Sequence, residues 1–340
     1  MKTSRLVVTA LVLALGVTIP AGTAFAGNTP LPNGFTAKVV ARSGQTISGN
    51  IDAKGYDLGI YIGSGIENVK VVGATVTGAS DEGILVQDAS DSLIENSTVE
   101  GNAGNPFSTV EGTEVKAIAL AGTRNILVEH NTVEGNRHGG IGVYDDGPNS
   151  LFAPNAIDTA AVAGTGNIVS DNLVKDDLND CGIVLSAKNP GGTVSGNVIS
   201  GNNVAGYDPA VGDSIPGVGG IVVAGGSYGT VNITNNVVSN NVVTGGFIPG
   251  ISLHAMTSAS GHGTISGTQL TGNVLSDNGF GGVSMQPTGI EIAALGGTIS
   301  GTEVRRDRIS FDFYGVYHIG DTNTTISNLM TNNVKDPVYP

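Results

Sequence analysis

Residues 263–278 read GTISGTQLTGNVLSDN, and residues 297–312 read GTISGTEVRRDRISFD. The Gly-Thr-Ile-Ser-Gly-Thr phrase is identical in the two stretches. Asn273 and Asn278 of the first copy are replaced by Asp307 and Asp312 at the matching places of the second. Self-similarity at a fixed spacing is the signature of a repeat architecture, so this pair of stretches decides the class of fold.

The same motif extends along the chain. An apolar residue is followed by Asn, Ser or Asp three positions later, by a second apolar residue, and by Asn or Asp five positions after the first polar one. The copies are Ile94-Ser97-Val99-Asn102, Val128-Asn131-Val133-Asn136, Val169-Asn172-Val174-Asp177, Val194-Asn197-Ile199-Asn202, Ile233-Asn236-Val238-Asn241, Leu270-Asn273-Leu275-Asn278, Val304-Asp307-Ile309-Asp312 and Thr325-Asn328-Met330-Asn333, with a degenerate copy at Val71-Ala74-Val76. This alignment predicts that Asn131, Asn172 and Asn197 stack in one file.

A second phrase, Gly-[Ile/Val]-x-apolar, lies between the copies, as in GILV at Gly83, GIGV at Gly140 and GIVL at Gly182. Its alternation is that of a β-strand with one buried face. A unit of 21 to 25 residues cannot bury that face alone and must stack on its neighbours. The sequence therefore predicts an all-β, single-domain, right-handed parallel β-helix of roughly ten coils, with three short strands per coil about 4.8 Å apart.

The repeated Asn residues fit the corners of such a coil. Asn and Asp tolerate left-handed backbone angles and form local hydrogen bonds at tight bends. Stacked on successive coils, their amides predict ladders that satisfy buried corner groups. The role expected for these residues is structural.

The ends of the chain predict export. Lys2 and Arg5 precede an apolar run, Leu6–Ile19, and Ala24-Phe25-Ala26 is typical of a signal-peptidase site. We expect a signal peptide at residues 1–26, a lead-in or cap at 27–44, the β-helix at 45–335 and a tail at 336–340. With no lipid-anchor cysteine after the run and no stretch of about 20 apolar residues, we expect a secreted protein without a transmembrane helix.

Composition limits the partners. The formal charge is −14, with 29 acidic against 15 basic residues, and this surface repels nucleic acid and anionic membranes. A single cysteine, Cys181, excludes an intramolecular disulfide, and we expect it to be a small buried hydrophobe. We expect a monomer.

The repeats resemble the pectate-lyase-like superfamily of right-handed parallel β-helix proteins. Phrases such as NDCGIVLSAKNPGGTVSGNVISGN (residues 179–202) and GVGGIVVAGG (217–226) look most like the periplasmic copper-maturation and the carbohydrate-binding and sugar-hydrolase domains of that superfamily. The resemblance covers about residues 45–335 and implies the fold and a glycan partner. It assigns no catalytic residues, because the polygalacturonase, pectate lyase and mannuronan epimerase motifs are incomplete or missing here.

Strand alternation places a candidate site instead. Residues one and three positions after the Gly should point inward, so those at even positions should line a solvent-exposed trough. His138 as base, Asp180 as orienting carboxylate, and the cations Arg137 and Lys188 suit lyase or epimerase chemistry on a uronic acid. Asp145 or Asp146 together with Asp180 would suit glycoside hydrolysis instead.

Other interpretations stay open at this point. The same face suits a non-catalytic glycan-binding module or a structural or adhesive solenoid, and Arg137 also suits a plain surface ion pair. Asp145-Asp146-Gly147 is also an ordinary turn sequence. Ca²⁺ is the cofactor compatible with Asp145-Asp146 or Asp176-Asp177, although the Asp-x-Asp-x-Asp pattern of calcium loops is missing.

Overall fold

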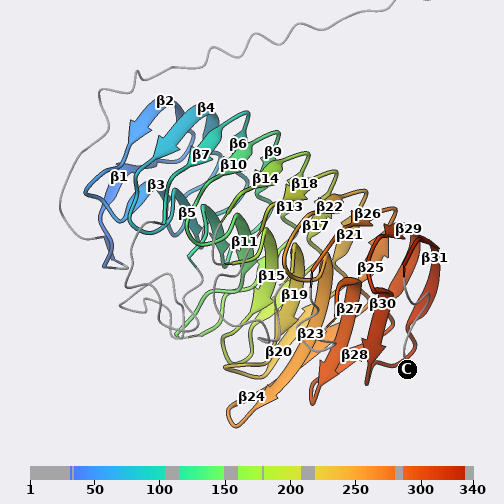
Figure 1. Ribbon diagram of the computed structural model, residues 1–340. Coiled ribbons are helices and arrows are strands. Elements are labelled where there is room, and N and C mark those ends of the chain that lie inside the picture. Colours follow the sequence, from blue (N-terminus) through green and yellow to red (C-terminus); the bar gives the residue numbers. More distant parts are fainter. Residues whose placement is uncertain are drawn as a thin grey trace, which may run out of the picture.

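The computed structural model describes residues 31–32, 34–103, 115–148, 160–177, 180–207, 219–279 and 286–333. Every regular element in these ranges is a β-strand, and the strands wind into one elongated solenoid (Figure 1). None of the described residues forms a helix long and apolar enough to cross a membrane. Longer spacings between repeats predict insertions at 103–114, 146–164, 203–217 and 256–262. The predicted signal peptide, the predicted tail and large parts of the first three insertions lie outside the described residues.

One row of parallel strands is made by the Gly-Ile/Val phrases, and we call it the Gly-strand sheet. Each strand pairs in register with the equivalent strand of the next coil, for example Ile141 with Ile183 and Tyr144 with Ser186. The ten strands within the described residues confirm the predicted number of coils. They are β1 (Ala37–Val40), β3 (Leu58–Ile62), β5 (Ile84–Gln87), β8 (Ile118–Ala121), β11 (Ile141–Tyr144), β15 (Ile183–Ala187), β19 (Ile221–Gly225), β23 (Ile251–Ser258), β27 (Thr288–Leu295) and β30 (Tyr314–Ile319).

The Asn-containing repeats form two further rows. Near the two ends of the solenoid, β4 and β29 each pair with both rows and join them into one sheet. The second row holds β2 (Thr46–Asp52), β4 (Lys70–Thr77), β6 (Leu93–Glu95), β9 (Leu127–Glu129), β13 (Ile168–Ser170), β17 (Val198–Ser200), β21 (Val237–Ser239), β25 (Gln269–Thr271), β29 (Glu303–Ser310) and β31 (Thr325–Thr331). The third row holds β7 (Thr98–Glu100), β10 (Thr132–Glu134), β14 (Leu173–Lys175), β18 (Asn203–Ala205), β22 (Val242–Thr244) and β26 (Val274–Ser276).

A fourth row corrects the prediction of three strands per coil. The later coils add β12 (Gly164–Thr165), β16 (Thr193–Ser195), β20 (Val231–Thr234), β24 (Gly261–Ser266) and β28 (Thr298–Ser300). The predicted insertion at 256–262 is a hairpin, in which β23 and β24 extend past the body of the solenoid and pair antiparallel at Thr257 with His262 (Figure 1). The Gly-Thr-Ile-Ser phrases of the opening stretches belong to this row.

The core runs along the whole inside of the solenoid. In the Gly-strands, residues one and three positions after the Gly point inward as predicted, and Ile141 and Val143 are fully buried. Val99, Val133 and Val174 fill the core from the third row. Burying one such side chain stabilises the fold by roughly 1.5–3 kcal/mol, so stacking the coils supplies most of the driving force.

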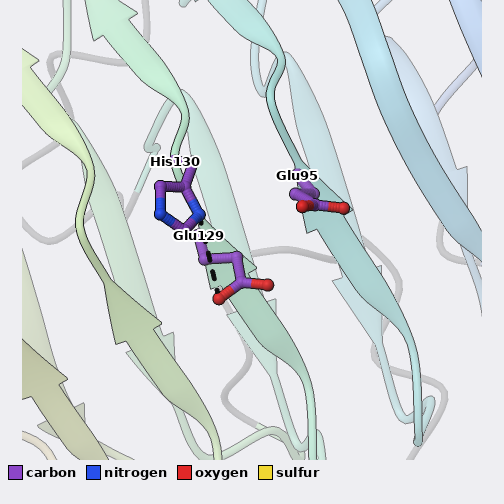
Figure 2. Close-up of side chains that lie close together, drawn as sticks. All are labelled: Glu95, Glu129 and His130. Atoms are coloured by element: carbon purple, nitrogen blue, oxygen red, sulfur yellow. Dashed lines mark ion pairs between the residues drawn. The ribbon is translucent and has the colours of Figure 1, made fainter. Parts of the chain in front are cut away.

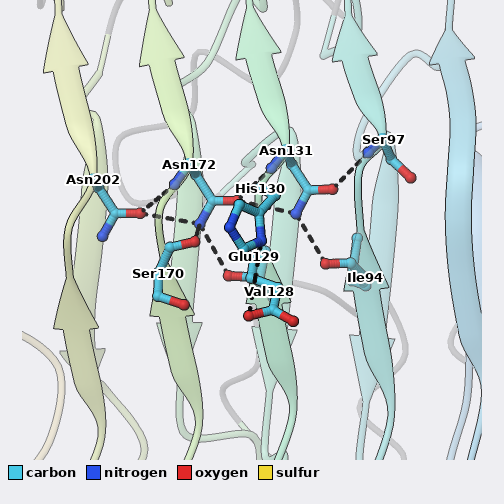
Figure 3. A network of polar contacts seen from close by, with 9 residues as sticks. All are labelled: Ile94, Ser97, Val128, Glu129, His130, Asn131, Ser170, Asn172 and Asn202. Carbon is cyan, nitrogen blue, oxygen red and sulfur yellow. Dashed lines mark hydrogen bonds and ion pairs between the residues drawn. The ribbon is translucent and has the colours of Figure 1, made fainter. Parts of the chain in front are cut away.

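Asparagine ladders follow the corners between the rows (Figure 3). Asn131 Nδ2 donates to Asn172 Oδ1 (3.0 Å), and Asn172 Nδ2 donates to Asn202 Oδ1 (3.0 Å). The backbone N–H groups of Asn131 and Asn172 donate to the same oxygens, at 2.9 and 3.0 Å. Each amide also donates to a strand carbonyl of the preceding coil, as Asn131 does to Ile94. The ladders therefore satisfy corner groups that burial would otherwise leave without partners.

The alignment of the repeats was wrong by five residues in the middle of the chain. Asn197 does not follow Asn172; it accepts from Asn167 Nδ2 (3.1 Å) and donates to Asn236 Oδ1 (3.1 Å) in a separate ladder. Asn recurs every five residues because consecutive corners lie five residues apart. Sequence spacing alone therefore could not tell one corner from the next.

A third ladder contains a bridged gap. In this ladder the Asn102 side chain donates to Asn136, and the Asn136 side chain donates to Asp177 at 2.9 Å. Two coils further on, Gly246 holds the equivalent position and has no side chain that could hydrogen-bond to the next coil. The Tyr207 ring lies over Gly246, and its hydroxyl donates to Asn278 Oδ1 at 2.6 Å. Tyr207 therefore spans the missing rung.

Asp307 and Asp312, which replace Asn in the stretch 297–312, act as acceptors in these ladders. Asp307 Oδ1 accepts from the backbone N and the Nδ2 of Asn273 at 2.7 and 2.8 Å, and Asp312 accepts from the backbone of Asn278. Their other oxygens are buried without hydrogen bonds in the structure. Burial raises the pKa of Asp307 to about 6 and that of Asp312 to about 7. These two rungs keep the geometry of Asn but leave one oxygen unsatisfied.

Replacing the buried carboxylate by the amide of its neighbours should stabilise the protein. In Asp307→Asn, the new Nδ2 should donate as Asn273 Nδ2 does to Val238 O (3.1 Å), adding about 1 kcal/mol at neutral pH. The raised pKa means that the folded state holds the Asp307 proton to higher pH than the unfolded chain, whose pKa is near 3.8. The contribution of Asp307 to wild-type stability therefore falls as pH rises from about 4 to about 6. The gain in unfolding free energy from Asp307→Asn should reach its full value only above that range.

Urea unfolding at pH 4 and pH 8 measures this difference. The control is Asp171→Asn, at an exposed corner residue with a left-handed φ of 54°, which should change little. An Asp307→Asn protein less stable than wild type at pH 8 would contradict the account of the ladder.

Gly246→Ala should destabilise the fold by about 1–3 kcal/mol, because the added methyl group would overlap the Tyr207 ring. In a Tyr207→Ala background, the same substitution should cost much less, since the overlapping ring is gone. A double-mutant cycle of unfolding free energies measures this coupling. Additive effects would show that Tyr207 does not span the gap.

Candidate functional site

The outer side of the Gly-strand sheet is not the exposed trough predicted from alternation. Leu85, Val184 and Val222, two positions after the Gly, are buried in a second apolar cluster, and Tyr144 is only 1 % exposed. The sequence carried a signal for this: GILV, GIVL and GIVV are continuous apolar runs, and parallel strands buried on both faces have such runs. From β3 to β19 every residue of the described Gly-strands is buried, so the accessible polar groups of these coils lie at the strand ends.

The six candidate residues fall into two groups at opposite ends of the strands. Arg137 and His138 precede β11, and Asp180 precedes β15, whereas Asp145, Asp146 and Lys188 follow these strands. A strand of four or five residues separates its two ends by roughly 15 Å. The structure brings the first three residues to one corner and the last three to another, so the six do not surround one sugar ring.

The partner of Asp180 at the first corner is a buried lysine. Lys116 is 1 % exposed, and its Nζ forms an ion pair with Asp180 Oδ2. The other Asp180 oxygen accepts from the backbone N of Cys181 at 2.6 Å. Asp180 itself is about a quarter exposed. A buried cation thus holds a carboxylate at the edge of solvent.

Gly139 makes this ion pair possible. Lys116 comes from the coil before that of His138, and Asp180 from the coil after it. The Lys116 side chain crosses Gly139, where an added Cβ would lie 2.9 Å from Lys116 Cδ and 2.8 Å from the Cys181 carbonyl oxygen. Gly139 also has a left-handed φ of 63°. Sequence reasoning missed the pair because it links two coils that are not consecutive.

Accessible groups surround the ion pair on the middle coil. His138 is half-buried and Arg137 is exposed, immediately before the Lys116 crossing at Gly139. An imidazole and a guanidinium therefore lie at the surface, beside a buried ammonium and a partly exposed carboxylate. This corner, comprising Lys116, Arg137, His138 and Asp180, is the candidate site.

Buried titratable groups lie behind the candidate site. Burial raises the Tyr144 pKa well above its ordinary value, and the nearby charge of Asp180 adds to the effect. Burial also raises the pKa of Glu82 well above its ordinary value, with a further contribution from Asp81. The Cys181 thiol is buried as predicted, and burial raises its pKa too. Burial thus disfavours the charged forms of these groups, which line the inner side of the candidate site.

At the second corner, buried carboxylates accept hydrogen bonds from the backbone and fix the path of the chain. Asp145 is buried, and its two oxygens accept from the backbone N of Lys188 (2.8 Å) and of Asn189 (2.9 Å). Asp146 is also buried and accepts from Gln87 Nε2 at 2.8 Å and from the Gly147 backbone at 2.9 Å. These contacts support the turn interpretation of Asp145-Asp146. The carboxylate oxygens that a Ca²⁺ ion would need are already hydrogen-bonded.

Lys188 has an unusual environment at this second corner. Its ammonium lies 5.2 Å from the centre of the Tyr228 ring, and burial lowers its pKa to about 7. Such a lysine is half-neutral at physiological pH.

An open groove of about 540 Å³ lies elsewhere, along the corner that follows the third row. Glu100 and Glu134 line it, and neither corner of the Gly-strand sheet contributes to it. Glu134 is paired with Lys175 Nζ at 2.7 Å. The groove offers a second, acidic surface for a ligand.

Comparisons with known proteins agree with this architecture. Residues 21–158 match the family model described as right handed beta helix region. Together with the parallel stacked rows, this match makes the protein a right-handed parallel β-helix, the class that the repeats predicted. No curated protein matches the sequence.

Solved structures with the same fold differ widely in sequence. The surface adhesin PfbA of Streptococcus pneumoniae has a TM-score of 0.54 at 13 % identity, over 90 % of this chain and 84 % of that one. The A-module of the mannuronan C-5 epimerase AlgE4 of Azotobacter vinelandii has 0.46 at 13 %, over 91 % and 84 %. The alginate lyase of Paenibacillus sp. str. FPU-7 has 0.45 at 14 %, over 88 % and 92 %. At 13 % identity, the likeness to the adhesin is one of fold alone.

Removing the buried cation should be costly. Lys116→Met leaves Asp180 beside an apolar wall and should lower the free energy of unfolding by about 3 kcal/mol. Adding Asp180→Asn should recover part of that loss. Lys175→Met removes the surface pair with Glu134, in which each side chain is about one third exposed, and should cost much less because solvent screens this pair.

Urea unfolding of wild type, Lys116→Met, Asp180→Asn, the double variant and Lys175→Met measures these differences. Equal losses for Lys116→Met and Lys175→Met, or a double variant that loses the sum of the single effects, would show that the Lys116–Asp180 pair has no special weight.

Proposed function

We propose that the protein is an exported carbohydrate-active β-helix that acts on a uronic-acid-containing polysaccharide at the candidate site. The observation that supports this is the Lys116–Asp180 pair, with His138 and Arg137 at the surface of the coil between its partners. Export is proposed from the basic and apolar pattern of residues 1–26. A surface of net charge −14 needs local cations to hold a polyanion, and this corner supplies them.

The chemistry suited to these residues is proton abstraction next to a carboxylate. The guanidinium of Arg137 would pair with the uronate carboxylate and stabilise the negative charge that develops when C5 loses its proton. The imidazole of His138 would accept that proton. Asp180, fixed by Lys116, would orient the imidazole or the sugar hydroxyls.

Two outcomes then follow from one intermediate. In β-elimination, the C4–O4 bond breaks as the C4=C5 double bond forms, and the leaving O4 takes a proton from water. In epimerisation, water delivers a proton to C5 from the opposite face, and no bond of the chain breaks. In both cases protonated His138 then gives its proton to the hydroxide that is left. Glycoside hydrolysis with Asp145 or Asp146 has less support, because both carboxylates are buried and hold backbone N–H groups. Lys188 is retained as a contact for a neighbouring sugar.

A non-catalytic role is the second candidate. The same architecture serves in a protein named as a surface adhesin, and the groove lined by Glu100 and Glu134 offers a separate surface for glycan binding. Binding without turnover would favour this role.

The test uses the chain from residue 27 with alginate, polygalacturonate and a neutral glucan, with and without Ca²⁺. Ultraviolet absorbance detects the unsaturated product of elimination, and NMR in D₂O detects deuterium at C5 after epimerisation. His138→Gln should lower the rate at least about 100-fold, as expected for loss of a general base. The matched control His262→Gln, in the β23–β24 hairpin, should keep the rate.

The possible results separate the candidates. Turnover that is equal in His138→Gln and wild type would overturn the assigned site. Saturable binding without turnover, weakened by Arg137→Ala, would replace the enzyme by a binding module at the same corner. Neither turnover nor binding on any uronate would overturn both.

A further inference from the structure

The register of the second row forces two glutamates together on the outer surface. Strands β6 and β9 pair with Leu93 opposite Leu127 and Glu95 opposite Glu129. Residues that occupy equivalent positions on adjacent coils lie about 4.8 Å apart. Like charges directly opposite each other are destabilising, so this pair raises the question of what offsets its charge.

On the third row, a lysine offsets the charge of the equivalent glutamate pair, whereas no such lysine in the described part of the chain contacts Glu95 or Glu129. Glu100 and Glu134 are also in register, and Lys175 Nζ lies 2.7 Å from Glu134 Oε2. Among the ion pairs formed by the described residues, no lysine or arginine contacts Glu95 or Glu129. The neighbour of Glu129 is the imidazole of His130, whose Nδ1 lies 3.9 Å from Glu129 Oε2.

His130 completes a compact set of donor atoms (Figure 2). It follows β9 at a corner with a left-handed φ of 55°, and its side chain lies beside those of Glu129 and, on the neighbouring strand, Glu95. One ligand atom from each of the three residues lies within 4.8 Å of the other two. Glu95 and Glu129 are partly exposed and His130 is 53 % exposed, so an ion could reach them directly from solvent.

We propose that Glu95, Glu129 and His130 form a surface site for a divalent transition-metal cation of the Zn²⁺ class. One imidazole nitrogen and two carboxylate oxygens are ligands that Zn²⁺ takes, at roughly 2.0–2.2 Å in tetrahedral geometry. That geometry needs donor atoms roughly 3.4 Å apart, which rotation of the exposed side chains can supply. The ion offsets the Glu95–Glu129 repulsion and leaves a fourth position for water.

The ligand set favours Zn²⁺ over Ca²⁺. Ca²⁺ takes six to eight oxygen ligands, whereas this site offers a nitrogen and two carboxylates on two rigid strands. The site lies on the second row, away from the candidate site on the Gly-strand sheet, and its existence does not depend on the proposed function.

Titration calorimetry with ZnCl₂ tests the site, using untagged, chelator-treated protein from residue 27. One Zn²⁺ should bind per chain, and Glu95→Gln and His130→Gln should each raise the Kd at least tenfold. Glu100→Gln, in the neighbouring in-register pair, and His262→Gln are the matched controls and should leave the Kd unchanged. CaCl₂ at the same concentrations should give no comparable binding.

Thermal unfolding gives a second readout that needs no activity. Zn²⁺ should raise the melting temperature of wild type through mass action, and this rise should be smaller in His130→Gln. Absence of Zn²⁺ binding at millimolar concentration would overturn the site. So would equal weakening by Glu100→Gln, or equal binding of Ca²⁺, because either would show general attraction of cations to an acidic surface.

Discussion

In-register stacking of one coil on the next is the constraint on which the rest of this structure depends. Parallel main-chain hydrogen bonds fix the spacing at about 4.8 Å, and they place equivalent residues of successive coils directly above one another. Every side chain therefore has a neighbour of the same structural position on each side. A column of equivalent positions can therefore contain only residue types that are stable next to a copy of themselves.

Apolar and amide side chains satisfy that limit in different ways. Valine and isoleucine stack into a continuous core, since each new coil buries the exposed edge of the last. Asn suits the corners because it donates and accepts, so each amide can pass a hydrogen bond to the next. Asp307 and Asp312 keep the acceptor and lose the donor, and Tyr207 bridges a rung that Gly246 cannot form.

Charged side chains do not tolerate repetition, and this gives functional meaning to the places where they stack. The Lys116 side chain crosses Gly139 and pairs with Asp180 two coils away. This pair fixes a carboxylate at the corner that also holds His138 and Arg137. The Glu100–Glu134 pair is offset by Lys175. The Glu95–Glu129 pair is offset by no lysine or arginine among the described residues, and it is there that the metal site is proposed.

The sequence by itself determined the architecture, because a short unit with one apolar face and polar corners has few ways to bury that face. The coil number, the inward residues and the structural role of Asn followed from local periodicity. Only the tertiary structure decided the register of the ladders, since a five-residue spacing fits either of two adjacent corners. It also decided that the six candidate residues divide between two corners and that Lys116 pairs with Asp180. Those facts depend on which coils lie side by side and on which small residues leave space for a side chain to cross, and no local pattern records either.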